Sequence, residues 1–241
     1  MVGVKVVWIS AGISSFIAGW LVRNSVDKWI YIDVADQHPD SMRFIRDCEK
    51  LIDKEIEILR SEKYKDVADV VRTHRMINSP YGAACTGMLK KAVRKQWEQE
   101  HLGEPLKYVW GMDSKEVKRA ESIKANFPEF EHEFPLIDRE LSKDDCHALA
   151  MQLGLKRPVM YDLGYSNNNC IGCVKGGMWY WNKIRVDFPE VFKARAELER
   201  EIGHSCLNGI FLDELEPGRG RKSEELNGDC SVMCWLVQNE M

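Results

Sequence analysis

The sequence predicts an α/β protein: a parallel five-stranded sheet with helices on both faces, followed by a Cys-rich C-terminal module. Short apolar runs alternate with longer segments of helical periodicity up to about residue 160. Strands that alternate with helices form parallel sheets through right-handed crossovers. After Gly164 the composition changes, and the sequence predicts a loop rich in Asn, Gly and Cys. We therefore expect one domain over residues 1–160 and a helical module over 161–241 packed on it.

Each element is assigned from its own pattern. The expected strands are Lys5–Ile9, Trp29–Ile32, Val67–Val71, Tyr108–Gly111 and His132–Pro135. The expected helices are Phe16–Val22, Asp40 to about Ser61, Thr86–Glu100, Lys115–Ala125 and Pro189–Ile202. Ser142 and Asp145 fit a capping box that opens a further helix to Gln152, with Gly154 just beyond its end.

Bulk composition is that of an ordinary globular protein, with 44% hydrophobic and 30% charged residues. A net charge of −4 gives no global positive field that would draw the chain onto nucleic acid. The apolar stretch Val2–Val22 has no charged start and no cleavage site, and Ser10 and Gly12 interrupt it. Its apolar runs are too short to span a bilayer, so we expect a cytoplasmic protein without a membrane partner.

The turn between the first strand and the first helix is the first candidate for chemistry. It reads Ser10-Ala-Gly-Ile-Ser-Ser15. Small residues let backbone N–H groups approach an anion, and a helix N-terminus adds partial positive charge. A tight turn with Ser15 as the helix cap is the alternative. The turn is not a Walker A loop, because no Gly-Lys-Ser/Thr follows it.

This turn resembles the pyrophosphate-binding loop, or PP-loop, of ATP pyrophosphatases and phosphoadenosine-phosphosulfate (PAPS) reductases. Other segments resemble PAPS-reductase motifs in the same order: Asp33–Asp40, Cys85–Lys90, Gly111–Arg119, Phe134–Asp145 and Tyr165–Cys173. The set is most similar to PAPS-reductase family members from phages and mobile elements. The resemblance implies a Rossmann-like sheet of the adenine nucleotide alpha-hydrolase-like type.

The resemblance also implies roles for single residues. Nucleotide phosphates would be bound by Ser10, Gly12, Ser14 and Ser15. Asp33 would lie beside the adenosine, and Arg119 would be a second cofactor-binding residue. Lys90 would be a phosphate-facing cation and Cys85 a reactive thiol, which makes these two the candidate catalytic residues. The alternative for Lys90 is a solvated helix residue within a basic run.

Two departures from the family pattern bear on the nucleotide. Asp113 stands where the family has a phosphate-binding arginine, and an acid there repels a 3′-phosphate. ATP is therefore favoured over PAPS. The family's C-terminal E-C-G-x-H motif, which supplies the nucleophile, is missing, and Asp229-Cys-Ser231 is its nearest equivalent.

The cysteines are the second candidate. A C-x-x-C at Cys170 and Cys173 and a C-x-x-x-C at Cys230 and Cys234 supply four thiolates. Such a set suits zinc or a [4Fe–4S] cluster, and buried free thiols are the alternative. Resemblance to adenylylsulfate reductases implies a second set, in which Cys85 joins the C-x-x-C and one tail cysteine.

Three functions follow as hypotheses. The first is a sulfonucleotide reductase-like enzyme, or an ATP-dependent sulfur transferase, that binds ATP or PAPS. The second is an ATP pyrophosphatase that adenylates and thiolates tRNA or DNA, with a sulfur donor protein as a possible partner. The third is a non-catalytic nucleotide-binding module. The sequence leaves the sulfur acceptor, the metal and the oligomeric state open.

Overall fold

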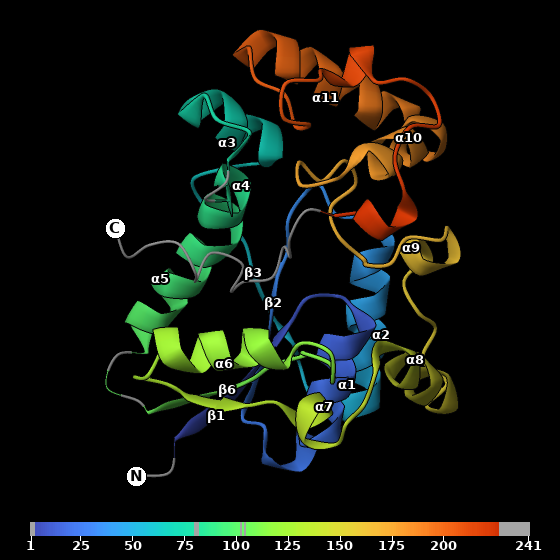
Figure 1. The fold of residues 1–241 in the computed structure, drawn as a ribbon. Coiled ribbons are helices and arrows are strands. Elements are labelled where there is room, and N and C mark those ends of the chain that lie inside the picture. Colours follow the sequence, from blue (N-terminus) through green and yellow to red (C-terminus); the bar gives the residue numbers. More distant parts are fainter. Residues whose placement is uncertain (1–2, 80–81, 102, 104, 227–241) are drawn as a thin grey trace. The chain divides into compact units, whose positions relative to one another are not determined.

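The computed structural model describes residues 3–79, 82–101, 103 and 105–226 (Figure 1). The chain forms two compact units, and each is discontinuous in sequence. The sheet unit contains residues up to Asp33, His38–Leu59 and Gln96–Asn168. The helical unit contains Val34–Gln37, Arg60–Lys95 and the described residues from Asn169 onward. The expected boundary at residue 160, between a nucleotide-binding domain and a module packed on it, stays a prediction.

The sheet unit is built on a five-stranded sheet in the order β3-β2-β1-β6-β7, and every neighbouring pair is parallel. Its strands are β1 (Val4–Ile9), β2 (Lys28–Ile32), β3 (Glu57–Leu59), β6 (Leu106–Val109) and β7 (Glu131–Glu133). The α/β class and the parallel five-stranded sheet are thereby confirmed. The order places β1 at the centre, so its carboxyl end lies between those of β2 and β6.

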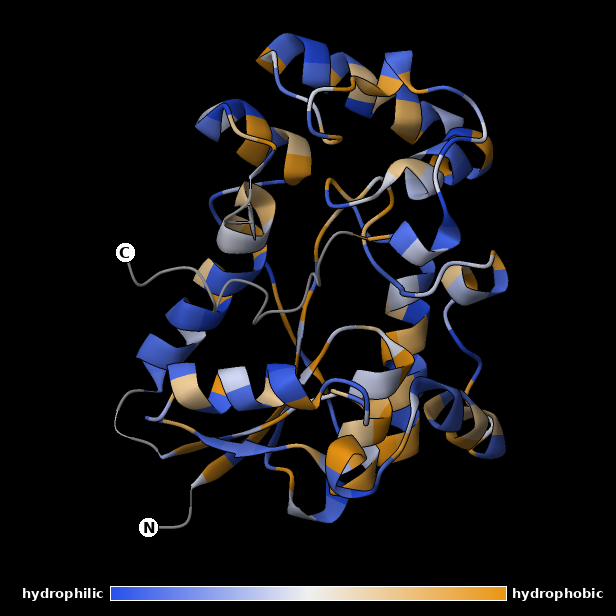
Figure 2. Ribbon diagram, viewed as in Figure 1, coloured by the Kyte–Doolittle hydropathy of each residue, from blue (hydrophilic) through white to orange (hydrophobic). Residues whose placement is uncertain are grey.

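Both faces of the sheet are covered, which explains why the central strands β1 and β2 bury consecutive residues without alternation, while the edge strand β7 is polar. On one face Val7 packs in a core with Phe16 and Trp29. On the other, the Trp8 ring lies edge-on to Trp97, with centroids 5.6 Å apart. Figure 2 shows the resulting hydrophobic strands between helices that are hydrophilic on their outer sides. The expectation of helices on both faces is confirmed.

The helices of the sheet unit are α1 (Ile13–Leu21), α2 (Asp40–Ile52), α6 (Val117–Asn126), α7 (Pro135–Asp138), α8 (Lys143–Gln152) and α9 (Val159–Asp162), with a 3₁₀ turn at Arg23–Ser25. Helices α1, α6 and α8 lie near the expected ranges, α2 ends earlier than expected, and α7 and α9 were not expected. Helix α5 (Ala92–Glu100) contributes its second half. The capping box at Ser142 and Asp145 is present, as expected. Helix α1 packs against β1, α7 and α8.

One strand assignment was wrong. Val67–Val71 belongs to a helix, α3 (Val67–His74), because the Asp66 side chain caps it by accepting from the N–H of Asp69 at 2.8 Å. The third strand is β3, which lies inside the segment expected to continue the second helix. That helix ends at Ile52, since Asp53 adopts a left-handed backbone with φ of 51°.

The helical unit carries the remaining elements. They are α3, the antiparallel pair β4 (Asn78–Ser79) and β5 (Gly82–Ala83), α4 (Ala84–Thr86), a π-helical turn (Gly87–Lys91), the start of α5, α10 (Met178–Asp187), α11 (Pro189–Ile202), and 3₁₀ turns at Leu212–Glu214 and Lys222–Glu224. Helix α11 has the expected bounds and packs on α10 and α3. None of the helices in the described ranges is long and apolar enough to cross a bilayer.

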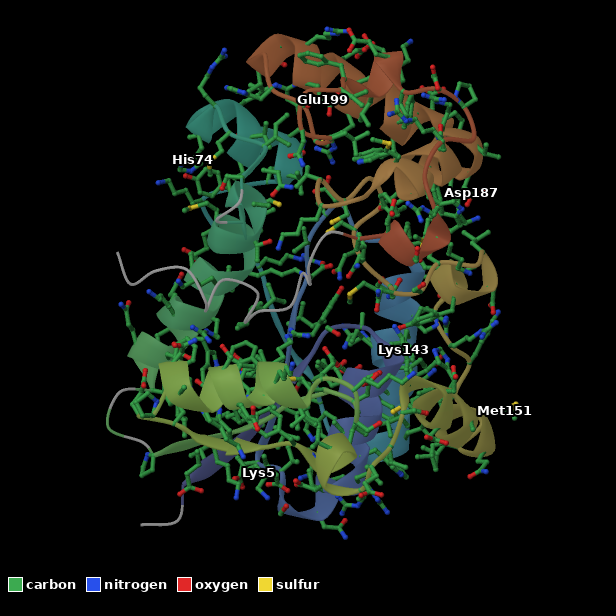
Figure 3. All side chains as sticks on the ribbon, in the orientation of Figure 1. Lys5, His74, Lys143, Met151, Asp187 and Glu199 are labelled. Carbon is green, nitrogen blue, oxygen red and sulfur yellow. The ribbon has the colours of Figure 1, made fainter. Side chains whose placement is uncertain are left out.

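A buried carboxylate organises the chain after α11. Glu199, labelled in Figure 3, is fully buried. Its two carboxyl oxygens accept the backbone N–H groups of Cys206 at 2.5 Å and Leu212 at 2.6 Å. Burial raises the pKa of the Glu199 carboxyl, and the two N–H donors act against that shift. Glu199 therefore ties the irregular segment after α11 back onto the helix.

Candidate functional site

The loop from Ser10 to Ser15 joins the central strand β1 to α1. Its shape depends on Ala11, which is buried and left-handed with φ of 55°. The Ser15 hydroxyl donates to the carbonyl of Gly12 at 2.9 Å and accepts from the N–H of Ser10 at 3.0 Å. Ser15 thus fastens the loop from inside the helix, while the N-cap position belongs to Gly12. The expectation that Ser15 caps the helix was wrong.

The first turn of α1 is open to an anion. Gly12 has extended backbone and makes no side-chain capping bond, and the turn carries no acidic residue. The N–H of Ile13 donates to the Tyr161 hydroxyl over 3.4 Å, a long contact. Burial raises the pKa of Tyr161 to about 12, so this hydroxyl stays neutral at physiological pH. The positive end of α1 thus has no side-chain cap and no acidic residue that would oppose a negatively charged group, and the N–H of Ile13 meets a neutral hydroxyl.

Gly111 sets how closely the neighbouring strand approaches this loop. It follows β6, the strand beside β1. A Cβ at Gly111 would lie 2.4 Å from the Cα and 2.6 Å from the backbone nitrogen of Ser15. Only glycine fits such a contact, since real Cβ atoms do not come so close to backbone. Its position at the end of the expected strand Tyr108–Gly111 was the available sequence signal for this role.

Asn168, the last residue of the sheet unit, stabilises the loop from Ser10 to Ser15. It was not predicted from the sequence. Its side-chain amide donates to the carbonyl of Ala11 at 2.8 Å and to the Ser41 hydroxyl at 3.0 Å. Asn168 is buried, so both bonds are shielded from water. The segment before it is held by Lys143, labelled in Figure 3, whose ammonium donates to the side chain of Asn167 at 2.6 Å.

Replacing Asn168 with Ala is expected to lower the free energy of unfolding by about 1–3 kcal/mol, because it leaves the Ala11 carbonyl buried without its donor. Urea denaturation followed by circular dichroism measures the change. Asn126→Ala is the matched control, since the Asn126 amide bonds only the exposed Ser122 hydroxyl at 3.3 Å and should cost under about 0.5 kcal/mol. An equal decrease in the free energy of unfolding in both variants would show that Asn168 does not stabilise the loop.

Asp33 lies where the resemblance requires it, at the carboxyl end of β2. Its carboxylate accepts from the Tyr31 hydroxyl at 3.4 Å, and its N–H donates to Leu59 at 2.9 Å. Because β1 and β2 are parallel neighbours, Asp33 and Ser10 follow adjacent strands at one edge of the sheet. The structure thus brings Asp33 to the same edge as the loop, while its role toward adenosine stays a prediction.

Ser14 stands where many PP-loops have an aspartate, and it faces helix α8. Burial raises the pKa of the Cys146 thiol there to about 11, and a hydrogen bond with Ser14 opposes that shift. Cys146 is fully buried and therefore a thiol at physiological pH. The loop consequently presents no carboxylate of its own to a phosphate.

Arg119 is near the start of α6, and its charge is already engaged. Its guanidinium lies 2.6 Å from the Glu116 carboxylate. The same carboxylate accepts the N–H of Asp113 at 3.1 Å, and Asp113 accepts the N–H of Lys115 at 2.9 Å. The one arginine of this segment is thus paired with Glu116, and Asp113 adds a second acid to the same segment. Such a segment is a poor receptor for a second phosphate group.

Cys85 and Lys90 belong to the helical unit, on α4 and on the π-helical turn. Both are 8% exposed, so the expectation of Lys90 as a solvated residue was wrong. Lys91 and Arg94 are buried beside it. Burial, together with Lys95 and Arg94, lowers the pKa of Lys91 to about 8. The side chains of Lys90, Lys91 and Arg94 place positive charge within one buried segment of the helical unit.

The C-x-x-C lies on a loop that Tyr180 holds. The Tyr180 hydroxyl donates to the carbonyl of Cys170 and accepts the N–H of Cys173, both at 2.9 Å. Both cysteines are buried. Cys230 and Cys234 lie outside the described residues.

A metal ion would need ligands beyond this pair. Across residues 3–226, leaving out the few positions not described, no three Cys, His, Asp or Glu side chains come together as a metal site. The second ligand set, which requires Cys85 beside Cys170 and Cys173, is therefore not formed in this structure. The first set depends on Cys230 and Cys234 and stays a prediction.

Comparison with known proteins gave likeness at the level of solved structures. No protein-family model matches the chain, and no curated protein sequence matches it. Among solved structures, the chain is similar to a phosphoadenylyl-sulfate (PAPS) reductase from Candida auris in a phosphate complex. That likeness has a TM-score of 0.49 and 11% sequence identity over 69% of this chain and 80% of the other.

Proposed function

We propose that this chain is an enzyme of the sulfonucleotide reductase-like or ATP-dependent sulfur-transferase kind. It binds an adenine nucleotide, with the phosphates on the loop from Ser10 to Ser15. The observation that carries the proposal is the uncapped start of α1 at the carboxyl end of the central strand. In parallel α/β sheets, ligands bind outside the carboxyl ends of the strands, and phosphates bind at helix N-termini.

ATP is the nucleotide that the charges support better. PAPS carries a 3′-phosphate, which needs a free cation. The only arginine of the segment that would supply it, Arg119, is paired with Glu116, and Asp113 adds another negative charge. The triphosphate of ATP needs backbone donors and a lysine instead. The loop offers the first, and Lys90, on the helical unit, is proposed as the second from the motif resemblance alone.

The chemistry beyond binding rests on sulfur. We propose Cys85 as a reactive thiol and the thiolates of Cys170, Cys173, Cys230 and Cys234 as ligands of zinc or a [4Fe–4S] cluster. Such a centre would supply soft-ligand or redox chemistry for sulfur transfer. What supports the pair on this chain is the Tyr180 hydroxyl, which bonds the backbone at both cysteines and fixes their loop.

Isothermal titration of the purified protein with ATP, and separately with PAPS, tests the proposal. We expect micromolar binding of ATP and weaker binding of PAPS. Lys90→Ala should weaken ATP binding roughly 10- to 100-fold, the loss of one charge-assisted hydrogen bond. Lys95→Ala is the matched control, because Lys95 is exposed on the same helical segment and should leave binding within about twofold. Binding of neither nucleotide would contradict the proposal.

A further inference from the structure

A cavity of about 650 Å³ opens in the sheet unit beside helix α8 and the segment that follows it. This volume falls within the range of small-molecule sites, roughly 300–1,000 Å³. The nucleotide proposal does not use it. Its inner part is apolar, because Ala150 and Leu155 line it and are 2% and 5% exposed. Its rim carries Met151, which projects outward from α8 in Figure 3 and is 76% exposed.

The charges at this cavity have one sign. Lys156 and Arg157 line it, and no carboxylate does. Arg157 has an exposed partner, Asp162, at 2.6 Å. Such exposed pairs are weak, about 0–1 kcal/mol, and leave the guanidinium able to meet a second anion. Lys156 is exposed and adds a second cation. An apolar interior under a cationic rim is complementary to an organic anion.

The pKa of the histidine in the cavity lining is affected by the same positive charges. His147 lines the cavity, and its Nδ1 has no hydrogen-bond partner among the described residues. Burial lowers the pKa of His147 first, and the cations Lys143 and Arg157 lower it further. Asp144 acts in the opposite direction. The imidazole is thus neutral at physiological pH and sits in positive potential that a bound anion would offset.

The backbone of Lys156 and Arg157, which forms one wall of the cavity, is fixed by Arg43 behind it. Arg43 on α2 donates to the carbonyl of Lys156 at 2.9 Å and to that of Arg157 at 3.1 Å. Asp40 and Asp47 pair with Arg43 at 2.7 and 3.0 Å and fix its position. A wall braced in this way is pre-organised, so a ligand loses little binding free energy in ordering it.

We propose that this cavity binds a small organic anion, a carboxylate or sulfonate with an aromatic or aliphatic body. The apolar body lies against Ala150 and Leu155, and the anionic group meets Lys156 and Arg157. The ring of His147 forms one side of the site. This ring lies edge-on to Tyr161 with centroids 4.7 Å apart, and the Tyr161 hydroxyl accepts from Ile13 in the nucleotide loop. The site therefore adjoins the loop without sharing its residues.

The probe for the test is 8-anilinonaphthalene-1-sulfonate, an anion whose fluorescence rises in apolar surroundings. Its neutral counterpart, N-phenyl-1-naphthylamine, has the same body without the sulfonate. We expect the sulfonate to bind with a micromolar Kd and the neutral compound at least about fivefold more weakly. The double variant Lys156→Gln with Arg157→Gln should weaken sulfonate binding roughly 3- to 10-fold, the loss of two exposed charge contacts. Lys193→Gln, an exposed lysine of α11, is the control and should leave Kd unchanged.

A second variant tests the cavity itself. Ala148 lines it and is exposed, so Ala148→Trp fills the space at little cost to folding. We expect at least a tenfold loss of sulfonate affinity, and circular dichroism checks that the variant is folded. In the unaltered protein, nuclear magnetic resonance should show that the sulfonate raises the pKa of His147. A Kd within twofold of the unaltered protein in both variants, or an unmoved His147 pKa at saturation, overturns the proposal.

Discussion

Gly111→Ala is expected to weaken nucleotide binding at least roughly tenfold and to lower the free energy of unfolding by about 1–3 kcal/mol. The new Cβ would lie 2.4 Å from the Cα of Ser15. That atom belongs to the backbone of α1, so no side-chain rotation relieves the clash. The helix start or the end of β6 has to move, and either movement misplaces the backbone donors of the loop. Titration with ATP and urea denaturation measure the two effects.

Two glycine variants serve as controls for this prediction. A Cβ at Gly12 would meet the Ser10 hydroxyl oxygen at 3.2 Å, and that side chain can turn aside. Gly12→Ala should therefore cost under about 1 kcal/mol, although it lies in the loop itself. A Cβ at Gly87 meets nothing within 4 Å, so Gly87→Ala should be neutral or stabilising by up to about 1 kcal/mol. ATP binding by Gly111→Ala equal to that of the unaltered protein would show that the close approach is not needed.

Glu199→Ala is expected to lower the free energy of unfolding by about 3–5 kcal/mol, the largest stability effect that we predict. It removes both acceptors of the buried N–H groups of Cys206 and Leu212, and each orphaned group costs about 1–3 kcal/mol. Glu201→Ala on the same helix is the matched control. Glu201 pairs with Arg72 at 2.9 Å, where both side chains are about half exposed, so its loss should cost under about 1 kcal/mol.

The variant Glu199→Gln separates charge from hydrogen bonding. The folded-state pKa of Glu199 is raised, so its contribution to stability is fully present below the unfolded pKa of about 4.5 and is lost as pH rises through the folded value. Glutamine does not titrate. The free energy of unfolding of the unaltered protein minus that of Glu199→Gln should therefore decrease as pH rises above about 4.5. Chemical denaturation at several pH values measures this difference, and an increase with pH would show that the carboxylate is stabilised by its environment.

The elements that local residues specify were predicted well. An unbroken apolar run identified β1, and small residues after it identified the loop. The capping box at Ser142 and Asp145 and the proline that begins α11 marked helix starts correctly. These signals lie within a few residues of the feature they predict, so they can be recognised without knowledge of the tertiary structure.

The predictions failed where contacts with residues distant in sequence determine the local structure. Val67, Val70 and Val71 are β-branched and read as a strand, yet a helix forms because all three are buried together on one side. β3 is a short edge strand with one exposed and two half-buried residues, so its hydrophobic signal is weak. Asn168 acts through Ala11, which lies far away in sequence. No pattern local to either residue indicates that bond.

The order of strands has a consequence for synthesis of the chain. β1 pairs with β2 early, but its other neighbour, β6, follows about a hundred residues later. At roughly 5–20 residues per second, one hydrogen-bonding edge of this largely apolar strand remains unpaired on the order of 5–20 s until β6 is synthesised. An unpaired strand edge is a template for association with other chains. Yield of soluble protein should therefore respond to translation speed and to chaperones more strongly than the stability of the finished fold would indicate.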